Sequence, residues 1–322
     1  MAILVGIDEA GYGPILGPLV VSASVFELPD ALLGKSLWQV LPRSVCKNRQ
    51  GAGGRLVIND SKKLYLARGR YHLLQRGVLA ALIAAGNDPP GVLGDLLCCL
   101  EATCREHFSQ YPWYGPDAEV YPLNYNSGDI STAANALVTE LKEHHIRLHT
   151  IWSRPILTGS FNQMIQTVNN KATVLFTVAS ELIYQAYQKF NRDNLQILID
   201  KHGGRSHYRA QLQRLFPDLN MKIIKEEDCL SSYHLTGSGS SMKIHFIARG
   251  DDRHLPVALA SMTSKYVREL FMELLNRYFQ RHCPTITPTA GYYQDGRRFL
   301  NDLKSHNLDP QLAPHHLLVR QR

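Results

Sequence analysis

The chain has 322 residues, of which 44% are hydrophobic and 20% charged, proportions typical of a soluble globular protein with a sizeable core. Its 35 Lys and Arg residues exceed its 28 Asp and Glu residues by a formal charge of +7, which favours a polyanionic partner such as a nucleic acid. The 6 cysteines form no C-x-x-C pair, so neither disulfides nor a zinc site is expected. No apolar run is long enough for a signal peptide or a membrane span, so a cytoplasmic protein without a membrane partner is expected.

The segment Gly6–Pro14 places two adjacent carboxylates beside a glycine-rich turn. The apolar run Ile3–Val5 predicts a buried strand that ends at Asp8 and Glu9. Neighbouring residues on a strand point to opposite faces, so the two carboxylates share a site only if the backbone bends, which the following glycines permit. Such a pair suits a hard cation bound to a phosphate, although solvated acids in a hairpin turn are the simpler interpretation of this segment alone.

A second polar segment, Asn59–Leu64, follows a short apolar run. Asp60 or Ser61 is predicted to cap a helix that starts near Lys62. The first N–H groups of that helix, with Lys62 and Lys63, would face an anion. A plain capped helix with solvated lysines is the alternative.

The remaining pattern alternates strands and helices, as in an α/β protein. Further strands are predicted at Gly17–Phe26, paired with the first strand as a hairpin, and at Ile146–Trp152, Leu195–Ile199, Met221–Ile224 and Met242–Ile247. Helices are predicted at Ala67–Ala85, Leu93–His107, Thr132–His145, Lys171–Phe190, Pro256–His282 and around Phe299. Residues 34–55 are expected to form a basic surface loop, 231–241 a flexible connector, and 110–116 an aromatic mini-core.

A third acidic residue follows the buried strand Leu195–Ile199. In open α/β sheets ligands bind at the carboxyl ends of strands, and Asp200 therefore repeats the placement of Asp8. This recurrence favours a shared acidic site over a lone turn residue. In the longest predicted helix, Glu269 lies off the apolar stripe one turn from Lys265, where a surface ion pair is the simplest interpretation.

Four segments in this order resemble the ribonuclease HII (type 2 ribonuclease H) family. Gly6–Pro14 resembles the family's Asp-Glu-Ala-Gly-Arg-Gly-Pro, and Asn59–Leu64 is similar to its Asp-Ser-Lys-Lys-Leu. Ile197–Asp200, after the helix with Lys171–Leu175, is similar to the strand that holds its third carboxylate. Ala260–Glu269 resembles its Ala-Ser-Ile-Ile-Ala-Lys-Val-Thr-Arg-Asp helix. The four segments span nearly the whole chain.

The resemblance implies a ribonuclease H-like fold, a mixed β-sheet flanked by helices, as a single domain over 1–322 with insertions at 34–55 and 90–145. It implies a monomeric enzyme that hydrolyses the RNA strand of RNA–DNA hybrids with Mg²⁺ or Mn²⁺, leaving 5′-phosphomonoesters. The catalytic, metal-binding carboxylates would be Asp8, Glu9, Asp200 and Glu269, with Asp8 bridging two ions. The substrate-binding residues would be Gly11, Tyr12, Gly13, Ser61, Lys62, Lys63, Lys265 and Tyr292.

The sequence departs from the family pattern at functional positions. Tyr12 replaces the arginine of a Gly-Arg-Gly turn that is associated with the 2′-hydroxyl at the cleavage site; the backbone amides of Gly11 and Gly13 remain able to make such contacts. Glu269 replaces an aspartate. Tyr292 matches a tyrosine that stacks on a sugar near an RNA–DNA junction, with a core aromatic as the alternative.

Three functions follow from these features. The leading one is a metal-dependent endoribonuclease acting on RNA in hybrids. The second is a nucleic-acid-binding protein with the same fold but weak or lost catalysis, which the changes at Tyr12 and Glu269 motivate. The third is a two-metal nuclease for DNA or for a particular nucleic-acid structure. A nucleophilic Ser or Cys hydrolase is poorly supported because the chain has no G-x-S-x-G elbow.

Overall fold

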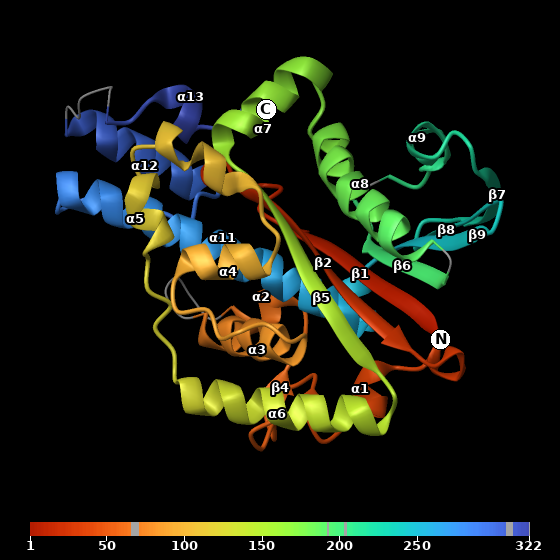
Figure 1. Cartoon of the computed structure of the whole chain (residues 1–322). Helices are drawn as coiled ribbons and strands as arrows, with labels where there is room; N and C mark the ends of the chain where they lie inside the picture. Colours follow the sequence, from red (N-terminus) through yellow and green to blue (C-terminus); the bar gives the residue numbers. More distant parts are fainter. Residues whose placement is uncertain (66–70, 192, 203–204, 307–311, 322) are drawn as a thin grey trace.

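The computed structural model describes residues 1–65, 71–191, 193–202, 205–306 and 312–321. A seven-stranded sheet with the order β5-β2-β1-β6-β9-β8-β7 forms its centre (Figure 1). The strands are β1 (Ala2–Ala10), β2 (Leu19–Leu28), β5 (Arg147–Ile156), β6 (Asn194–Asp200), β7 (Asn220–Glu226), β8 (Leu230–Gly237) and β9 (Ser240–Ile247). A separate parallel pair consists of β3 (Val45–Cys46) and β4 (Leu56–Val57).

The sheet is mixed, and its parallel part lies at its centre. β1 pairs with β2 and β2 with β5 in antiparallel fashion, whereas β1 pairs with β6 and β6 with β9 in parallel. β8 and β7 extend the sheet beyond β9 as antiparallel strands. The carboxyl ends of β1, β6 and β9 consequently meet at one edge. The predicted mixed sheet and the predicted N-terminal hairpin are both confirmed.

Helices cover both faces of this sheet (Figure 1). The longer ones are α3 (His72–Ala84), α6 (Ser127–Glu143), α7 (Thr158–Val168), α8 (Lys171–Phe190), α11 (Leu255–His282) and α12 (Tyr293–Ser305). The shorter ones are η1 (Asp30–Leu32), α1 (Leu37–Val40), α2 (Ser61–Leu64), α4 (Leu93–Cys99), η2 (Cys104–Gln110), α5 (Gly115–Glu119), α9 (Arg209–Leu215), α10 (Gly250–Arg253) and α13 (His315–Leu318). The start predicted for the helix at 67–85 lies partly outside the described residues.

Each face of the sheet has its own hydrophobic core. Helices α7 and α8 pack on one side, where Val174 and Leu182 join Val5 and Ile7 of β1. Helices α3, α4, α6 and α11 contribute to the core on the other side. Helix α11 approaches β1 so closely that a Cβ atom on Gly6 would lie 2.1 Å from the carbonyl carbon of Pro256. The polar residues of α11 that face this core are therefore buried as well.

Four local predictions differ from the structure. The single helix predicted at Leu93–His107 is instead α4 and η2, separated by residues 100–103. The first strand runs through Ala10, because Asp8 and Glu9 pair with β2 in unbroken register, so the acidic pair lies within the strand and the backbone does not bend at the pair as expected. Residues 231–241 form most of the hairpin β8–β9 instead of a connector: Tyr233 and Leu235 are buried, although their serine, histidine and glycine neighbours hide the alternation. Residues 34–55 contain α1 and β3 as well as loop.

The aromatic segment 110–116 is confirmed as core. Trp113 packs against Phe279 with 5.8 Å between ring centroids, and Tyr114 against Phe271 with 5.0 Å. Both partners belong to α11, so the segment joins the main core rather than forming a separate small one.

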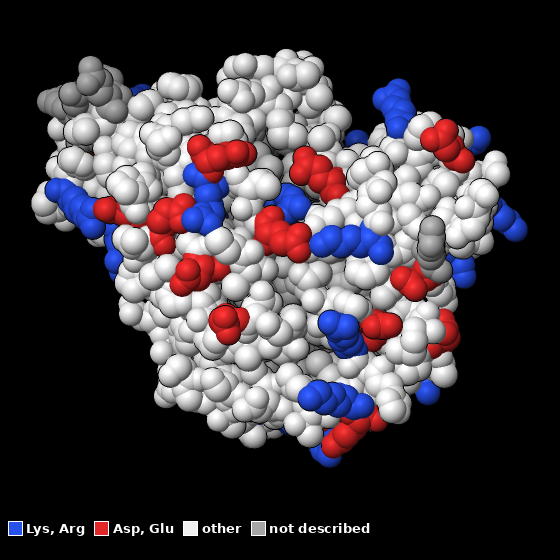
Figure 2. Space-filling view, in the orientation of Figure 1, with Lys and Arg blue, Asp and Glu red and all other residues white. Residues whose placement is uncertain are grey.

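The positive charge of the chain is not gathered in one band on the face drawn in Figure 2, where acidic and basic side chains are interspersed. Within the described ranges, no helix has both the length and the apolar character needed to cross a bilayer.

Candidate active site

Three aspartates lie at the carboxyl ends of the three neighbouring parallel strands. Asp8 is near the end of β1, Asp200 is the last residue of β6, and Asp251 follows β9 by four residues. The pairing of β1 with β6 places Asp8 and Asp200 at the same level of the sheet. The backbone N–H of Gly250 donates to Asp200 Oδ1 at 2.7 Å and holds the turn that carries Asp251 against β6. This is the position at which open α/β sheets bind ligands.

These aspartates and Glu9 share one electrostatic environment. Burial, and then the charges of Glu9, Asp200 and Asp251, raise the pKa of Asp8 well above its usual value. Burial and the charge of Asp200 raise the pKa of Glu9 to about 7. Burial and the charges of Asp60 and Asp200 raise the pKa of Asp251 to about 6, and burial also raises the pKa of Asp200. Each ionised carboxylate therefore opposes the ionisation of the others.

The donor chemistry of this group fits a hard divalent cation. Carboxylate oxygens are the ligands that Mg²⁺ and Ca²⁺ prefer in proteins, and a cation relieves the repulsion among them. Among the described residues, no three His, Cys, Asp or Glu side chains already surround one point as a preformed metal cage. The fit of this group to a cation thus rests on the mutual repulsion of its carboxylates and on their oxygen donors.

Lys62 is one of the cations beside this acidic group. Asp60 Oδ1 accepts a hydrogen bond from the backbone N–H of Lys62 at 2.8 Å and caps α2, which confirms Asp60 as a cap. Burial alone would lower the pKa of Lys62, but Asp60, Asp251, Asp8 and Asp200 outweigh that effect and raise it. Helix α2 itself is only 4 residues long, so its N-terminus adds little field of its own.

The two residues beside Lys62 have different surroundings. Ser61 is buried and accepts a hydrogen bond from the hydroxyl of Ser261 at 3.1 Å, which ties α2 to α11. Lys63 instead pairs with Asp252 at 2.7 Å. Asp252 is also 3.0 Å from Lys47 Nζ, so the structure places Lys63 in an ion-pair cluster of its own.

A cleft of about 430 Å³ adjoins the carboxylates. All of the predicted substrate-binding residues except Lys63 line it, together with Glu9 and Tyr65. A second cavity of about 290 Å³ contains Lys63, Asp200 and Asp251, and Lys62 lines both. Lys62 therefore lies between the cleft, which Glu9 lines, and the cavity that contains Asp200 and Asp251.

The turn after β1 forms one wall of the cleft and has a glycine where the backbone requires it. Gly11 has φ of +88°, and a Cβ atom there would lie 2.5 Å from the carbonyl oxygen of Pro18 and 2.7 Å from Nε of Arg268. At Gly13 a Cβ atom would meet nothing within 4 Å, so this side of the turn is open to an approaching ligand. Tyr12 lies between these two glycines, and burial and the charge of Glu9 raise its pKa.

Tyr292 lines the opposite part of the cleft and is 51% exposed. The core-aromatic alternative for this residue is therefore wrong. The guanidinium of Arg268 lies 5.8 Å from its ring centroid and supports the ring from the protein side.

Glu269 lies apart from the acidic group, in contrast to the expectation. Its carboxylate is buried, accepts from Lys265 Nζ at 2.7 Å and from the hydroxyl of Tyr65 at 2.9 Å, and lies 3.4 Å from Arg268. It is not among the largest influences on the pKa of Asp8, Glu9 or Asp200, and it lines a separate cavity with Tyr71 and Glu273. The simple interpretation of a surface pair with Lys265 also fails, because both side chains are buried within α11.

Asp251 occupies the place in the acidic group that was expected for Glu269. The sequence carried a weaker signal for it, because Asp251 follows the predicted strand Met242–Ile247 after three residues, whereas Asp200 follows Leu195–Ile199 directly.

No protein-family model and no curated protein sequence matches the chain. Among solved structures it is similar to a chain of the PCNA:RNase HII complex from Archaeoglobus fulgidus, with a TM-score of 0.46 and 15% identity over 99% of this chain and 94% of that one. It is also similar to Aquifex aeolicus RNase H3, with a TM-score of 0.42 and 14% identity over 98% of this chain and 71% of that one. Ribonuclease H2 from Pyrococcus horikoshii gives a TM-score of 0.42 and 14% identity over 96% of this chain and 91% of that one. At such identities and TM-scores the likeness assigns no function, and the function is argued below from the residues of this chain.

Proposed function

We propose that this protein is a metal-dependent endoribonuclease that hydrolyses the RNA strand of RNA–DNA hybrids, with Asp8, Glu9, Asp200 and Asp251 as its metal-binding carboxylates. The observation that carries the proposal is the group of four carboxyl groups with raised pKa values at the ends of β1, β6 and β9. Such a group is costly to ionise unless a divalent cation neutralises it. A pair of Mg²⁺ or Mn²⁺ ions bound there would activate water and stabilise the leaving 3′-oxygen.

The residues around the carboxylates would bind and orient the nucleic acid. Lys62 lies where the cleft and the acidic cavity meet, so its ammonium would bind a phosphate next to the scissile bond. The open side of the turn at Gly13 lets a sugar approach the main chain, whose N–H groups would bind a ribose 2′-hydroxyl and so distinguish RNA from DNA. The exposed ring of Tyr292 would pack on a neighbouring sugar.

Lys265 and Glu269 would be positioning residues in this scheme. Their ion pair is buried, the Lys265 ammonium lies 4.0 Å from the centroid of the Tyr65 ring, and Glu269 holds the Tyr65 hydroxyl. Together they fix the wall of the cleft that Tyr65 forms.

The alternative of a nucleic-acid-binding protein without efficient catalysis is less favoured than the sequence suggested. One of its two motives was the replacement of an aspartate by Glu269, and the acidic group is formed without Glu269. The change at Tyr12 remains, and it bears on recognition of the ribose rather than on the carboxylates.

The test is cleavage of three end-labelled duplexes with Mg²⁺ and with Mn²⁺: a full RNA–DNA hybrid, a DNA duplex with one ribonucleotide, and a DNA duplex. We expect cleavage of the hybrid, none in EDTA, and none by Asp8→Asn. Cleavage of the all-DNA duplex would instead identify the third function, a different nuclease. Tight binding of the hybrid without cleavage under any condition would establish the binding-protein alternative.

A further inference from the structure

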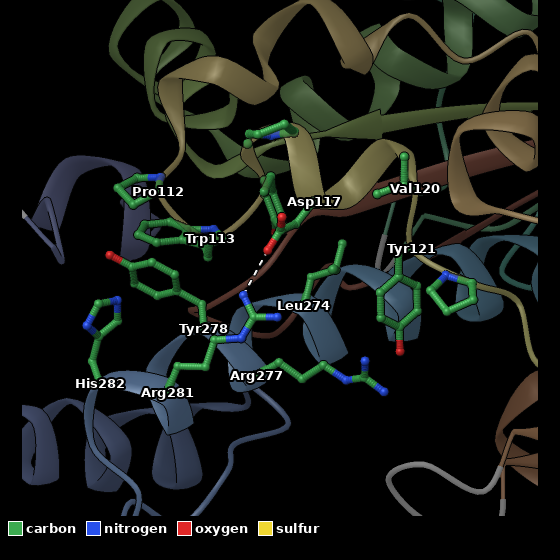
Figure 3. A pocket seen from close by; sticks show the side chains of 14 residues that line it. Pro112, Trp113, Asp117, Val120, Tyr121, Leu274, Arg277, Tyr278, Arg281 and His282 are labelled. Carbon is green, nitrogen blue, oxygen red and sulfur yellow. Dashed lines mark hydrogen bonds and ion pairs between the residues drawn. The ribbon is translucent and has the colours of Figure 1, made fainter.

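Away from the carboxylates, a groove of about 460 Å³ lies between the segment 112–122 and the C-terminal half of α11 (Figure 3). Trp113 and Tyr278 lie on one side of it and Tyr121 on the other, with Arg277 and Arg281 between them. Segment 112–122 belongs to the region 90–145, whose function the proposed chemistry does not explain.

The two arginines of this groove retain donors for a further partner. The Arg281 side chain is 68% exposed and makes one ion pair, with Asp117 at 2.8 Å. Arg277 makes one ion pair with Glu273 at 3.1 Å, and its guanidinium lies over the ring of Tyr121 at 4.7 Å. A guanidinium has five N–H donors in a planar fork, so a single carboxylate leaves most of them available to another acceptor.

The rest of the groove presents flat or apolar surface. Tyr278 is half-buried and its ring centroid lies 6.2 Å from that of Trp113 and 4.6 Å from that of His282. Val120 at the rim is 68% exposed. Aromatic rings and guanidinium planes of this kind are the surfaces on which unpaired nucleobases stack, largely without sequence preference.

Helix α11 connects this groove to the cleft at the carboxylates. Its residues 265, 269, 273, 277 and 281 follow one another at i, i+4 spacing and wind partway around the helix. Lys265 lines the cleft, whereas Arg277 and Arg281 line the groove. Twelve residues of helix span about 18 Å, a distance that about five or six nucleotides of one strand cover.

We propose that this groove binds the unpaired end of a nucleic-acid strand, with a base stacked on Tyr278 and the adjoining phosphates on Arg277 and Arg281. The inference rests on the proposed function, since the strand would come from the hybrid held at the carboxylates. An acidic peptide would meet the same arginines. A strand leaving the cleft is favoured because α11 leads from the one site to the other, and because Asp117, which lines the groove, is already paired with Arg281.

The test measures binding by fluorescence anisotropy in EDTA, so that no cleavage is required. A blunt RNA–DNA hybrid is compared with the same hybrid carrying a tail of about ten thymidines on either end of its DNA strand, enough to cover the distance at roughly 3.4 Å per nucleotide. The variants are Tyr278→Ala, which removes a stacking ring, and Arg281→Ala, which changes an exposed side chain. Arg214→Ala, an exposed position on α9, is the control with the same change in charge.

We expect a tail on one end to tighten binding about tenfold through stacking. Tyr278→Ala and Arg281→Ala should each remove most of this gain while leaving the affinity for the blunt hybrid unchanged, and Arg214→Ala should retain it. Equal affinity for tailed and blunt hybrids, or a gain that survives both variants, would overturn the inference and leave the groove to a peptide.

A failure of the proposed function gives a different result. If the protein does not bind the blunt hybrid, the thymidine strand alone should still bind, and both groove variants should weaken that binding. Absence of binding to the isolated strand as well would overturn the inference independently of the carboxylate site.

Discussion

Asp251 and Asp252 are neighbours in the chain with opposite electrostatic surroundings. Burial and nearby carboxylates raise the pKa of Asp251 to about 6. Hydrogen bonds from Lys63 and Lys47 lower the pKa of the exposed Asp252 to about 2. Asp251 lies among other carboxylates, whereas Asp252 is already paired with Lys63 and Lys47. Metal binding should therefore depend on one of the two and not on the other.

This contrast gives a matched pair of variants. Asp251→Asn should weaken Mn²⁺ binding and metal-dependent cleavage by more than the roughly 10- to 100-fold that loss of a residue behind a metal ligand costs. Asp252→Asn should change both by no more than a few-fold, because it only loosens an exposed ion-pair cluster. Calorimetric titration with Mn²⁺ and the cleavage assay measure the two effects. Equal losses in both variants would remove Asp251 from the metal site.

The turn after β1 offers a second comparison at this scale. Gly11→Ala places a Cβ atom at positive φ and against the carbonyl oxygen of Pro18, and should lower the free energy of unfolding by about 1–2 kcal/mol or more. Gly13→Ala meets open space and should leave stability nearly unchanged. Urea denaturation of the two variants checks this, and a stable Gly11→Ala protein would contradict the geometry of the turn.

At the scale of elements, α11 carries a buried ion pair that the carboxylate site does not use. Glu269→Gln leaves the ammonium of Lys265 buried without its counter-charge and should lower the free energy of unfolding by about 3–5 kcal/mol. Replacing both residues, by Lys265→Met with Glu269→Leu, should recover part of this loss because the buried ammonium is then gone, while the buried Arg268 still loses its contact with Glu269.

The same variants test the place of Glu269 in the molecule. The folded double variant should bind Mn²⁺ as the unchanged protein does, since Glu269 lies outside the acidic group. A loss of Mn²⁺ binding with stability retained would return Glu269 to the set of ligands.

Part of this arrangement is predictable from the sequence, for reasons that differ between elements. Asp8 and Asp200 follow runs of buried apolar residues, so periodicity and the rule on strand ends identify them. Asp251 is not identified in this way because three residues separate it from β9. The motif in α11 also led to the assignment of Glu269 as the fourth carboxylate. The burial of Glu269 depends on how closely α11 approaches β1, which local sequence does not encode. Strand β8 was missed because its polar residues conceal its alternation.

At the scale of the whole molecule, the acidic group links stability to pH and metal. The pKa values of Glu9 and Asp251 are about 7 and about 6 in the folded protein, above their ordinary values of 4.5 and 3.8. The folded state therefore binds more protons than the unfolded state between about pH 4 and pH 7. Stability from these groups is present below pH 4 and is lost as the pH rises through 6 and 7.

Two measurable effects follow from this linkage. In EDTA, Glu9→Gln should be more stable than the unchanged protein at pH 8, by a few kcal/mol at about 1.4 kcal/mol per unit of pKa shift, and this difference should shrink towards pH 4. Millimolar Mn²⁺ at pH 8 should raise the melting temperature of the unchanged protein, because the ion binds the ionised carboxylates of the folded state alone. Thermal unfolding across pH, with and without Mn²⁺, measures both effects. The linkage would be contradicted if the stability gained by Glu9→Gln over the unchanged protein were smaller at pH 8 than at pH 4.

The order of the central strands has a consequence for the biosynthesis of this protein. Asp8 leaves the ribosome early, but its parallel neighbour β6 ends at residue 200 and Asp251 comes later still. No N-terminal fragment shorter than about 250 residues can assemble the acidic group, and at roughly 5–20 residues per second its last member is added many seconds after the first. A growing chain shorter than this therefore lacks a complete acidic group.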